Sequence, residues 1–477
     1  MAGKRNKSSQ KSADPPLVRI RHRHMSVAYL TVWLVLIAYG LIMMFSASYG
    51  ISFVQSTHQI RASLEGESGA LGAVLEADAT ALARKQFILT LGGALAALFI
   101  GIFMNFRQFT RPAFRTILYV LVTVSLAYCQ LNGLLINGAR RWIDLGFTSF
   151  QPSELAKVGA VFFLAGYYSR RRRIRQREAV QAARGGPTKS LSRQAFWDVT
   201  WPGLLMLVWI LLILIQPHLS GALIMALISL VVFVLADIPM KQRLTGLVQL
   251  AALVLVLAIL LGAAYQAFTR QSSIDYVSDR FAHVFRRIGT FQDREAASQD
   301  DRMQIEQAEL ALGSGGLTGK GLGKSVQKLN WLSEAHNDFI LPIIGEELGF
   351  VGVSAVVLLF MAFLVFGILI ARRASSQMAM LVAAGNTILI SIQAFLNMAV
   401  SVSLIPTTGV SLPFFSYGGT ANIFFALASG LVLCVSKSGV VCDPRLMEVV
   451  SKKVPAVKKP DERCQDLDEE DGMGYAV

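Results

Sequence analysis

Residues 334–349 read EAHNDFILPIIGEELG and place carboxylates at the border of an apolar segment and inside it. Asp338 lies where a polar connection meets this segment, and Glu346 and Glu347 follow within it. Acidic residues at membrane depth are costly, so their presence in such a segment is a functional hypothesis by default. Asp338 has two interpretations: it is a catalytic carboxylate, or it is the N-cap of the helix that follows.

A second set of candidates lies in the short connection NGARRWIDLGFTSFQPSELAK, which begins at residue 137. Arg140 and Arg141 fall on the predicted outer side of the membrane, where arginine is not expected. A guanidinium group presents a fixed fork of donors that matches phosphate oxygens, so a lipid-linked pyrophosphate is a fitting ligand. Trp142 is an expected interfacial anchor that can also stack on a sugar. The alternative is that both arginines contact lipid headgroups.

Further polar residues lie inside or beside apolar segments. Glu154 and Lys157 are three residues apart, so one helix face holds both. This pair is either a neutralised structural pair or a device that orients a substrate pyrophosphate. His218, in QPHLSGALI, can titrate near neutral pH. A lone histidine at an interface is also often only a hydrogen-bonded polar residue.

The segment 378–404 carries Asn386, Gln393 and Asn397 at steps of seven and four residues, which places them on one helical face. A polar stripe at this depth faces protein or a wet cavity rather than lipid. Hydrogen bonding between helices is the alternative account.

The glycine-rich stretch GSGGLTGKGLGKSVQKL resembles a phosphate-binding loop, but Thr318 stands where that motif needs a glycine. The stretch also falls on the outer side, away from ATP. We therefore expect no nucleotide. We expect instead a flexible basic loop in which Lys320, Lys324 and Lys328 are available to an anion at the membrane surface.

Composition sets the class of protein that must position these residues. The chain has 477 residues, of which 53% are hydrophobic and 16% charged, and its repeated apolar runs longer than about 18 residues predict an all-α integral membrane protein. The first run, 25–46, follows a basic leader without a small-residue cleavage site, which favours a retained span. The net charge of +14 comes from basic residues beside apolar spans, which indicates contact with anionic lipid rather than nucleic acid. The spacing of the four cysteines suits neither a zinc site nor a disulfide framework.

Ten spans are predicted within a domain covering residues 25–437. They cover roughly residues 25–47, 85–105, 114–133, 152–169, 199–216, 219–237, 245–265, 351–371, 378–404 and 421–437. Lysine and arginine are concentrated in alternate connections and in both tails, which predicts cytoplasmic termini. The tails are the basic segment 1–24 and the segment 438–477, and disorder is predicted for about residues 1–16 and for the C-terminal tail, above all 455–477.

The connections between the spans differ in character. The largest, 266–337, is predicted to be outside. Residues 338–350 are interrupted by proline and glycine and predict a short interfacial or re-entrant helix that lines a polar cavity. Residues 405–420, rich in the same two residue types, predict a shaped loop.

Several motifs follow one another in this order: NGARRWI with QPSELAK, GKGLGKSVQKL, EAHNDFI with IGEELG, and LIPTTGVSLPFFSYGG. This series resembles the shape, elongation, division and sporulation (SEDS) family of peptidoglycan glycosyltransferases from about residue 25 to 436. The motif forms look more like the FtsW and SpoVE branch than the RodA branch. The family often has QPDLGT where this chain has QPHLSG, so His218 replaces an acid.

The resemblance implies polymerisation of lipid II on the outer face of the bacterial cytoplasmic membrane, in cell division or sporulation. It implies that Asp338 is the general base acting on the acceptor 4-hydroxyl in an inverting transfer. The residues predicted to bind the substrate are Arg140, Arg141, Trp142, Glu154, Lys157 and Asn397. The resemblance also implies help from a divalent cation (Mg²⁺ or Mn²⁺), a class B penicillin-binding transpeptidase as partner, and contact with other division proteins. A lipid II flippase and a non-catalytic division scaffold are the rival functions.

Overall fold

The computed structural model describes residues 24–63, 80–269 and 299–438, apart from residues 137, 147, 188, 330, 331 and 333. Both predicted tails, except their innermost residues, and residues 270–298 of the predicted outer loop lie outside the described residues. The helices are α1 (Val27–Ser63), α3 (Ala81–Phe103), η1 (Phe106–Thr110), α4 (Pro112–Asn132), α5 (Pro152–Ala183), α6 (Leu191–Ala195), η2 (Phe196–Thr200), α7 (Trp201–Ile215), α8 (Leu219–Leu235), α9 (Met240–Thr269), α11 (Gln299–Ser314), α12 (Ile340–Arg372), α13 (Gln377–Ser401) and α14 (Ala421–Ser436).

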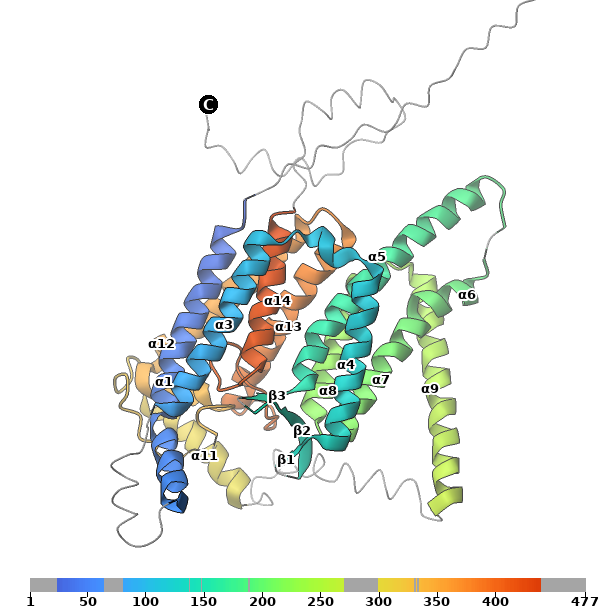
Figure 1. Cartoon of the computed structure of the whole chain (residues 1–477). Coiled ribbons are helices and arrows are strands. Elements are labelled where there is room, and N and C mark those ends of the chain that lie inside the picture. Colours follow the sequence, from blue (N-terminus) through green and yellow to red (C-terminus); the bar gives the residue numbers. More distant parts are fainter. Residues whose placement is uncertain are drawn as a thin grey trace, which may run out of the picture.

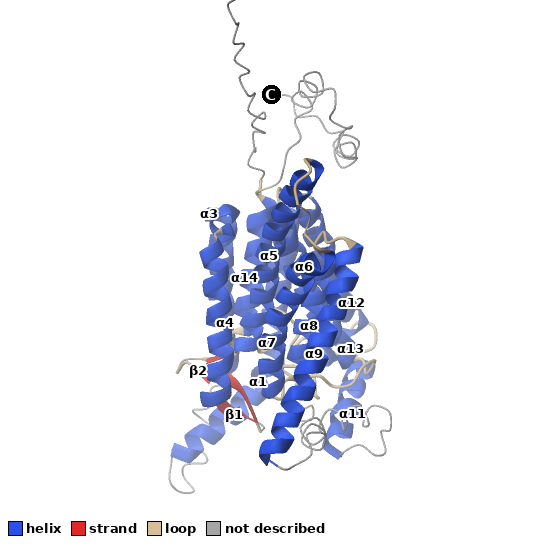
Figure 2. Ribbon diagram, turned by 90° about the vertical axis from the view of Figure 1, so that its right-hand side faces the viewer, coloured by secondary structure: helices blue, strands red, loops and turns tan. Residues whose placement is uncertain are grey.

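Each of the ten predicted spans coincides with a helix, and these helices run side by side as one bundle (Figures 1 and 2). In the described part of the chain, seven helices are long and apolar enough to cross a membrane, and α8 and α14 are shorter apolar helices. The tenth, α5, is apolar only in its first half, because arginines follow from Arg170 onward. The prediction of an all-α, multi-pass membrane protein is confirmed.

The bundle is organised around α13. Over the most apolar 18 residues of each helix, 72% of α13 is buried inside the protein, against 6% of α9. Helix α9 stands at the edge of the bundle (Figure 1). The polar side chains of α13 therefore face protein, as their spacing on one helical face predicted. Asn386, Gln393 and Asn397 are all fully or almost fully buried.

The first and last membrane helices end at the same face of the bundle, which we call the terminal face. The backbone N–H of Ser26 donates to Ser436 Oγ at 3.1 Å, and both ends lie at the top of Figure 1. An even number of spans requires this arrangement. The opposite end, the sheet face, carries the strands and α11 (Figure 1). That the terminal face is cytoplasmic stays a prediction from the lysine and arginine distribution.

A small antiparallel sheet at the sheet face was not predicted. It is formed by β1 (Leu134–Ile136), β2 (Ala139–Asp144) and β3 (Ser149–Phe150), in that order. The sheet occupies the connection in which the sequence indicated only a short loop. It matters for the site because successive residues of a strand point to opposite sides.

Helix α12 is broken at Gly349, whose φ of 66° and ψ of −162° are not helical. The break agrees with the predicted short helix, which here begins at Ile340. Ile343, Ile344, Glu346 and Glu347 are all fully buried, so protein surrounds this segment.

Candidate functional site

The turn that carries Asp338 is fixed through its backbone by two other elements. The N–H of Tyr417 donates to His336 O at 2.8 Å, Ser416 Oγ donates to Asn337 O at 2.6 Å, and Asn397 Nδ2 donates to Asp338 O at 2.8 Å. The loop 405–420 and α13 thus hold three successive carbonyl groups. These contacts fix the backbone from which the half-buried side chain of Asp338 projects.

The N-cap interpretation of Asp338 is wrong. The residue in the cap position of α12 is Phe339, and no side-chain cap hydrogen bond is formed there. The carboxylate lies instead beside residue 409: a Cβ added to Gly409 would be 3.5 Å from Asp338 Oδ2. Asn397 also donates to Val410 O at 2.7 Å, so one amide fixes both the acid and the segment next to it.

This segment forms one wall of a pocket of about 340 Å³, which we call the α8 pocket. It is lined by Arg141, Pro217, His218, Leu219, Ser220, Leu223, Ile224, Leu227, Leu396, Ile405, Pro406, Thr407, Thr408 and Val410. The first residues of α8 belong to the wall, so the positive end of this helix dipole lies at the pocket. Leucine and isoleucine side chains supply most of the apolar lining. The pocket is therefore suited to an amphiphile with an anionic headgroup.

The two predicted arginines lie apart. Arg141 lines the α8 pocket and donates from Nε to Gln216 O at 3.3 Å and from Nη2 to Pro217 O. Arg140, the preceding residue of β2, is exposed and donates from Nη1 to Leu131 O at 2.5 Å. Consecutive residues of a strand point to opposite sides, which explains the separation. Trp142 is partly buried, pairs with Leu134 in the sheet and does not line the pocket.

Glu154 and Lys157 form the predicted pair on α5 and connect it to α13. Lys157 Nζ lies 2.8 Å from Glu154 Oε1 and donates to Gln393 Oε1 at 2.7 Å. Both ionic side chains are buried. Glu154 Oε2 is buried without a hydrogen-bond partner among the described residues. A buried charge with an open oxygen retains capacity to bind a polar ligand or water.

His218 joins this cluster to the α8 pocket. Its Nδ1 lies 3.3 Å from Ser153 Oγ at the start of α5, and the imidazole lines the pocket beside Arg141. Burial, reinforced by the positive charges of Arg141 and Lys157, lowers the pKa of His218 to about 3. The imidazole is therefore neutral at physiological pH.

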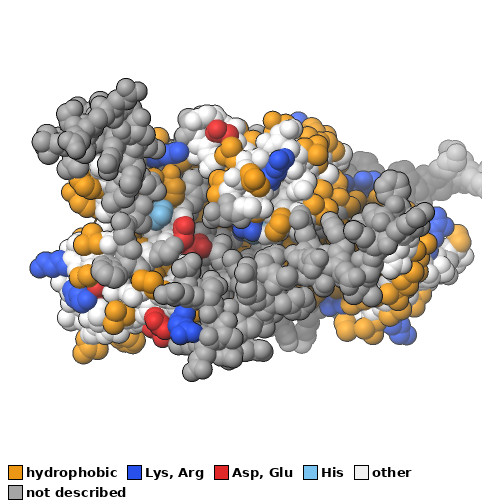
Figure 3. Space-filling view, turned by 90° about the horizontal axis from the view of Figure 1, so that it is seen from below, with side chains coloured by type: hydrophobic (Ala, Val, Ile, Leu, Met, Phe, Trp, Pro, Cys, Tyr) orange, Lys and Arg blue, Asp and Glu red, His pale blue; other side chains and the backbone are white. Residues whose placement is uncertain are grey.

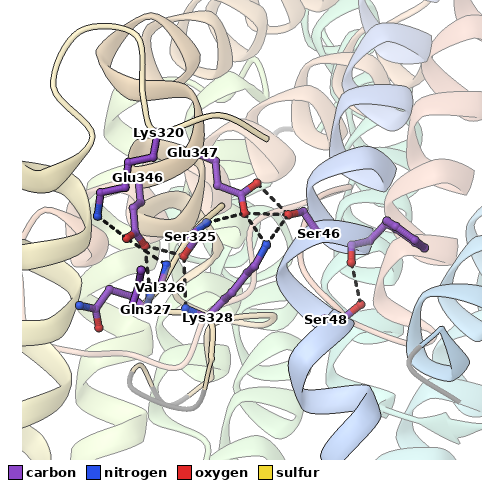
Figure 4. Close-up of polar contacts among 10 residues, drawn as sticks. Ser46, Ser48, Lys320, Ser325, Val326, Gln327, Lys328, Glu346 and Glu347 are labelled. Carbon is purple, nitrogen blue, oxygen red and sulfur yellow. Dashed lines mark hydrogen bonds and ion pairs between the residues drawn. The ribbon is translucent and has the colours of Figure 1, made fainter. Parts of the chain in front are cut away.

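Seen from the sheet face, acidic, basic and histidine side chains lie among apolar ones (Figure 3). The two further acids of the opening motif lie in a separate cluster, the Glu346–Glu347 cluster (Figure 4). Glu346 is bound by Lys320 Nζ at 2.7 Å, Ser325 Oγ at 2.5 Å and the N–H groups of Val326 and Gln327 at 3.1 and 3.2 Å.

The second acid of this cluster ties the glycine-rich stretch to α1. Glu347 Oε1 lies 2.7 Å from Lys328 Nζ, and Ser46 Oγ is within 2.7 Å of both carboxylate oxygens. Lys328 Nζ also donates to Ser46 Oγ at 3.0 Å. Each oxygen of the two acids therefore has a partner. The cluster fastens the glycine-rich stretch, α12 and α1 together.

The expectation of a flexible basic loop is wrong for this stretch. Lys320 and Lys328 neutralise the two acids, and only Lys324 of the three lysines is an exposed side chain without a described ion pair. The turn passes so close to α12 that a Cβ on Gly319, at φ 79°, would lie 2.1 Å from Glu347 O. The backbone N–H groups of Val326 and Gln327, just after the sequence that resembles a phosphate-binding loop, thus bind a carboxylate of the same chain.

No group of three or more histidine, cysteine, aspartate or glutamate side chains converges in the part of the chain that the structure describes. The described residues therefore do not fit a protein-built cage for the divalent cation that the resemblance implied. The sequence also missed Ser220 and Thr408 of the α8 pocket. The proline- and glycine-rich composition of 405–420 was the only signal for Thr408.

These observations define a multi-pass helical membrane protein with a half-buried acid beside an amphiphile pocket. The family model for FtsW, RodA and SpoVE, described as cell cycle protein, matches residues 26–439. The chain belongs to this family, and it is a multi-pass protein of the bacterial cytoplasmic membrane.

Two relatives illustrate the similarity. The chain is 36% identical over 302 residues to a probable peptidoglycan glycosyltransferase FtsW of Geobacter sp. (strain M18), covering 63% of this chain and 72% of the relative. It is 30% identical over 418 residues to a protein of the same name from Methylomonas methanica, covering 86% and 92%.

Solved structures agree with the fold. The crystal structure of the rod shape determining protein RodA from Thermus thermophilus matches with a TM-score of 0.54 at 25% identity, covering 88% of this chain and 98% of that one. A chain of a peptidoglycan synthase complex, from a study of how polymerization and crosslinking are coordinated, matches with a TM-score of 0.52 at 26% identity, covering 82% and 98%.

Proposed function

We propose that this protein is a peptidoglycan glycosyltransferase that polymerises lipid II at the outer face of the membrane, in cell division. The observation that carries the proposal is the position of Asp338, whose carboxylate adjoins the wall of a pocket suited to a lipid-linked pyrophosphate. The relatives described above are named as probable peptidoglycan glycosyltransferases, which supports the same activity.

In this proposal the donor's pyrophosphate binds at the polar end of the α8 pocket. Arg141 and the N-terminal end of α8 face its negative charge, and the apolar residues of the pocket contact the first part of its lipid. Lys157 lies deeper, bonded to Glu154 and Gln393. Lys157 adds positive potential, and its ion pair holds α5 against α13.

The chemical step is an inverting substitution. The 4-hydroxyl oxygen of the acceptor attacks the anomeric carbon of the donor, its proton passes to the Asp338 carboxylate, and the bond from the anomeric carbon to the pyrophosphate oxygen breaks. A general base of this kind contributes about 10²–10⁴-fold in rate when it is held within hydrogen-bond reach. Arg141 stabilises the charge that develops on the leaving pyrophosphate, an electrostatic contribution that is usually the largest.

We also propose a transpeptidase of the class B penicillin-binding type as partner, supported by the similarity to a chain of a peptidoglycan synthase complex. Mg²⁺ or Mn²⁺ assistance is a further proposal; since the described residues do not converge as a metal cage, no step is assigned to the cation.

The test is polymer formation by purified protein with lipid II and a matched transpeptidase, read as glycan strands on a gel. Asp338→Asn should reduce the rate by about 10² or more, because the amide cannot accept the proton. Glu334→Gln is the matched control, since Glu334 is an exposed acid of the same turn. A scaffold or a flippase would give no polymer from the unaltered protein, and near-normal polymerisation by Asp338→Asn would exclude the assigned base.

A further inference from the structure

The imidazole of His218 presents one bonded edge and one open edge. Nδ1 lies 3.3 Å from Ser153 Oγ, whereas Nε2 has no hydrogen-bond partner among the described residues. Only 8% of His218 is exposed, and this residue lines the α8 pocket. A polar atom without a protein partner on a residue that lines a cavity is open to a ligand or to water.

The surroundings of the ring fix its orientation. A Cβ added to Gly221 would lie 2.6 Å from His218 Nδ1 and Cε1 and 3.0 Å from Nε2, so the ring rests on the one position of this turn without a side chain. Arg141 binds the carbonyl groups of Gln216 and Pro217, which precede the histidine. Gln216 Nε2 in turn donates to Leu126 O at 2.9 Å. The imidazole is thus held by contacts on both sides of the turn.

Ser153 Oγ and His218 Nδ1 share one hydrogen bond, and the group that donates in it sets the tautomer of the ring. If Ser153 donates its hydroxyl proton to Nδ1, the neutral ring carries its proton on Nε2. That N–H is then a donor on a ring that lines the pocket together with Arg141 and the first residues of α8. His218 occupies the N-cap position of α8 and forms no side-chain cap bond, so those backbone donors are not satisfied by their own cap.

We propose that His218 is a positioning residue that binds the anionic headgroup of a polyprenyl pyrophosphate through Nε2–H at the N-terminus of α8. The inference rests on the proposed function and names a residue for its donor site. It differs from what the family pattern implies, because a carboxylate at this position could not donate. The headgroup would contact one neutral donor from His218, one cation from Arg141 and the end of a helix dipole.

The experiment measures binding of undecaprenyl pyrophosphate to the purified full-length protein in detergent with EDTA, so that no cation bridges an introduced carboxylate to the phosphates. His218→Ala should weaken binding about 5- to 20-fold, the scale of one hydrogen bond to a charged group. His218→Asn keeps an N–H donor and should stay within about 3-fold of the unaltered protein. His218→Asp should bind more weakly than His218→Ala, because like charges repel.

The His218→Asp variant distinguishes a role in binding the headgroup from a role in holding the helices together. Aspartate can still accept the Ser153 hydroxyl proton and hold α5 against α8, so a purely structural role predicts tight binding by His218→Asp. Tight binding by either His218→Asp or His218→Ala overturns the proposal. If the unaltered protein makes glycan polymer while those variants bind normally, only this inference fails. If the unaltered protein makes no polymer at all, the proposed function fails instead.

Discussion

Two groups of buried polar residues lie near the sheet face and differ in how completely they are bonded. In the Glu346–Glu347 cluster every carboxylate oxygen accepts from a lysine, a serine or a backbone N–H, and both partner lysines come from one glycine-rich stretch (Figure 4). Only the amide oxygen of Gln327 is left without a partner there. Buried carboxylates whose oxygens are all hydrogen-bonded are typical of a cluster that stabilises the fold.

The region around Asp338 and the α8 pocket shows the opposite pattern. Buried oxygen or nitrogen atoms of Glu154, His336, Asn337, Asn397 and Thr408 have no hydrogen-bond partner among the described residues. Burial of an acid at membrane depth therefore did not distinguish the two regions, since both contain such acids. The unused bonding capacity did, because polar atoms left open inside a protein cost free energy that a ligand or water can recover.

The largest expected change concerns stability in the Glu346–Glu347 cluster. Glu347→Ala leaves Lys328 buried beside Ser46 without its carboxylate, and breaking a buried pair in this way costs about 3–5 kcal/mol. The midpoint of thermal unfolding in detergent should fall markedly. Lys324→Ala is the control, since that lysine is exposed and belongs to the same stretch. An unchanged midpoint for Glu347→Ala would mean that the cluster is not structural.

A smaller change is expected in the α8 pocket, where the two neighbouring arginines provide a matched pair. Arg141→Ala should lower polymer formation by about 10- to 100-fold, the scale of charge-assisted hydrogen bonds, and Arg141→Lys by less. Arg140→Ala should stay within about 2-fold, because Arg140 is exposed and contacts Leu131 O away from the pocket. An equal loss of polymer formation in Arg141→Ala and Arg140→Ala would indicate that both arginines bind the substrate.

The smallest expected effect is a dependence of stability on pH. Burial lowers the pKa of His218 to about 3, whereas the unfolded chain has a histidine pKa of about 6.5. Between these values the unfolded state binds the extra proton, so stability falls as pH decreases, by up to about 1.4 kcal/mol per pH unit. The positive charges of Arg141 and Lys157 oppose protonation of the imidazole. Glu154 neutralises Lys157, and Ser153 is uncharged.

The measurement is the unfolding midpoint at pH 7 and pH 5 for the unaltered protein and for His218→Asn. The difference between the two pH values should be smaller in the variant, because asparagine does not titrate. An identical difference would show that His218 takes up protons alike in the folded and unfolded states, so that folding does not lower its pKa.

The sequence predicted the features that depend on local pattern. The ten helices follow from apolar length, which needs no knowledge of neighbours. The ion pair of Glu154 and Lys157 follows from spacing on one helix. The position of Asp338 just before the start of α12 was predicted from its place between a polar and an apolar segment.

The remaining features depend on contacts between distant segments. Lys320 and Lys328 reach Glu346 and Glu347 only because the chain turns back on α12, and Ser46 joins them from a separate helix. The separation of Arg140 from Arg141 required a strand that is six residues long and has no strong sequence signal. The α8 pocket likewise forms only when residues 405–410 fold against α8.

One paired measurement tests the contrast most directly: glycan polymer formed per unit of folded protein for Asp338→Asn and for Glu347→Gln. The account predicts that Asp338→Asn retains the unfolding midpoint and loses about 10²-fold or more in polymer. It predicts that Glu347→Gln lowers the midpoint but keeps polymer per folded molecule within about 3-fold, since its role is structural. Polymer retained by Asp338→Asn, or lost by folded Glu347→Gln, would contradict the assignment of catalysis to one region and structure to the other.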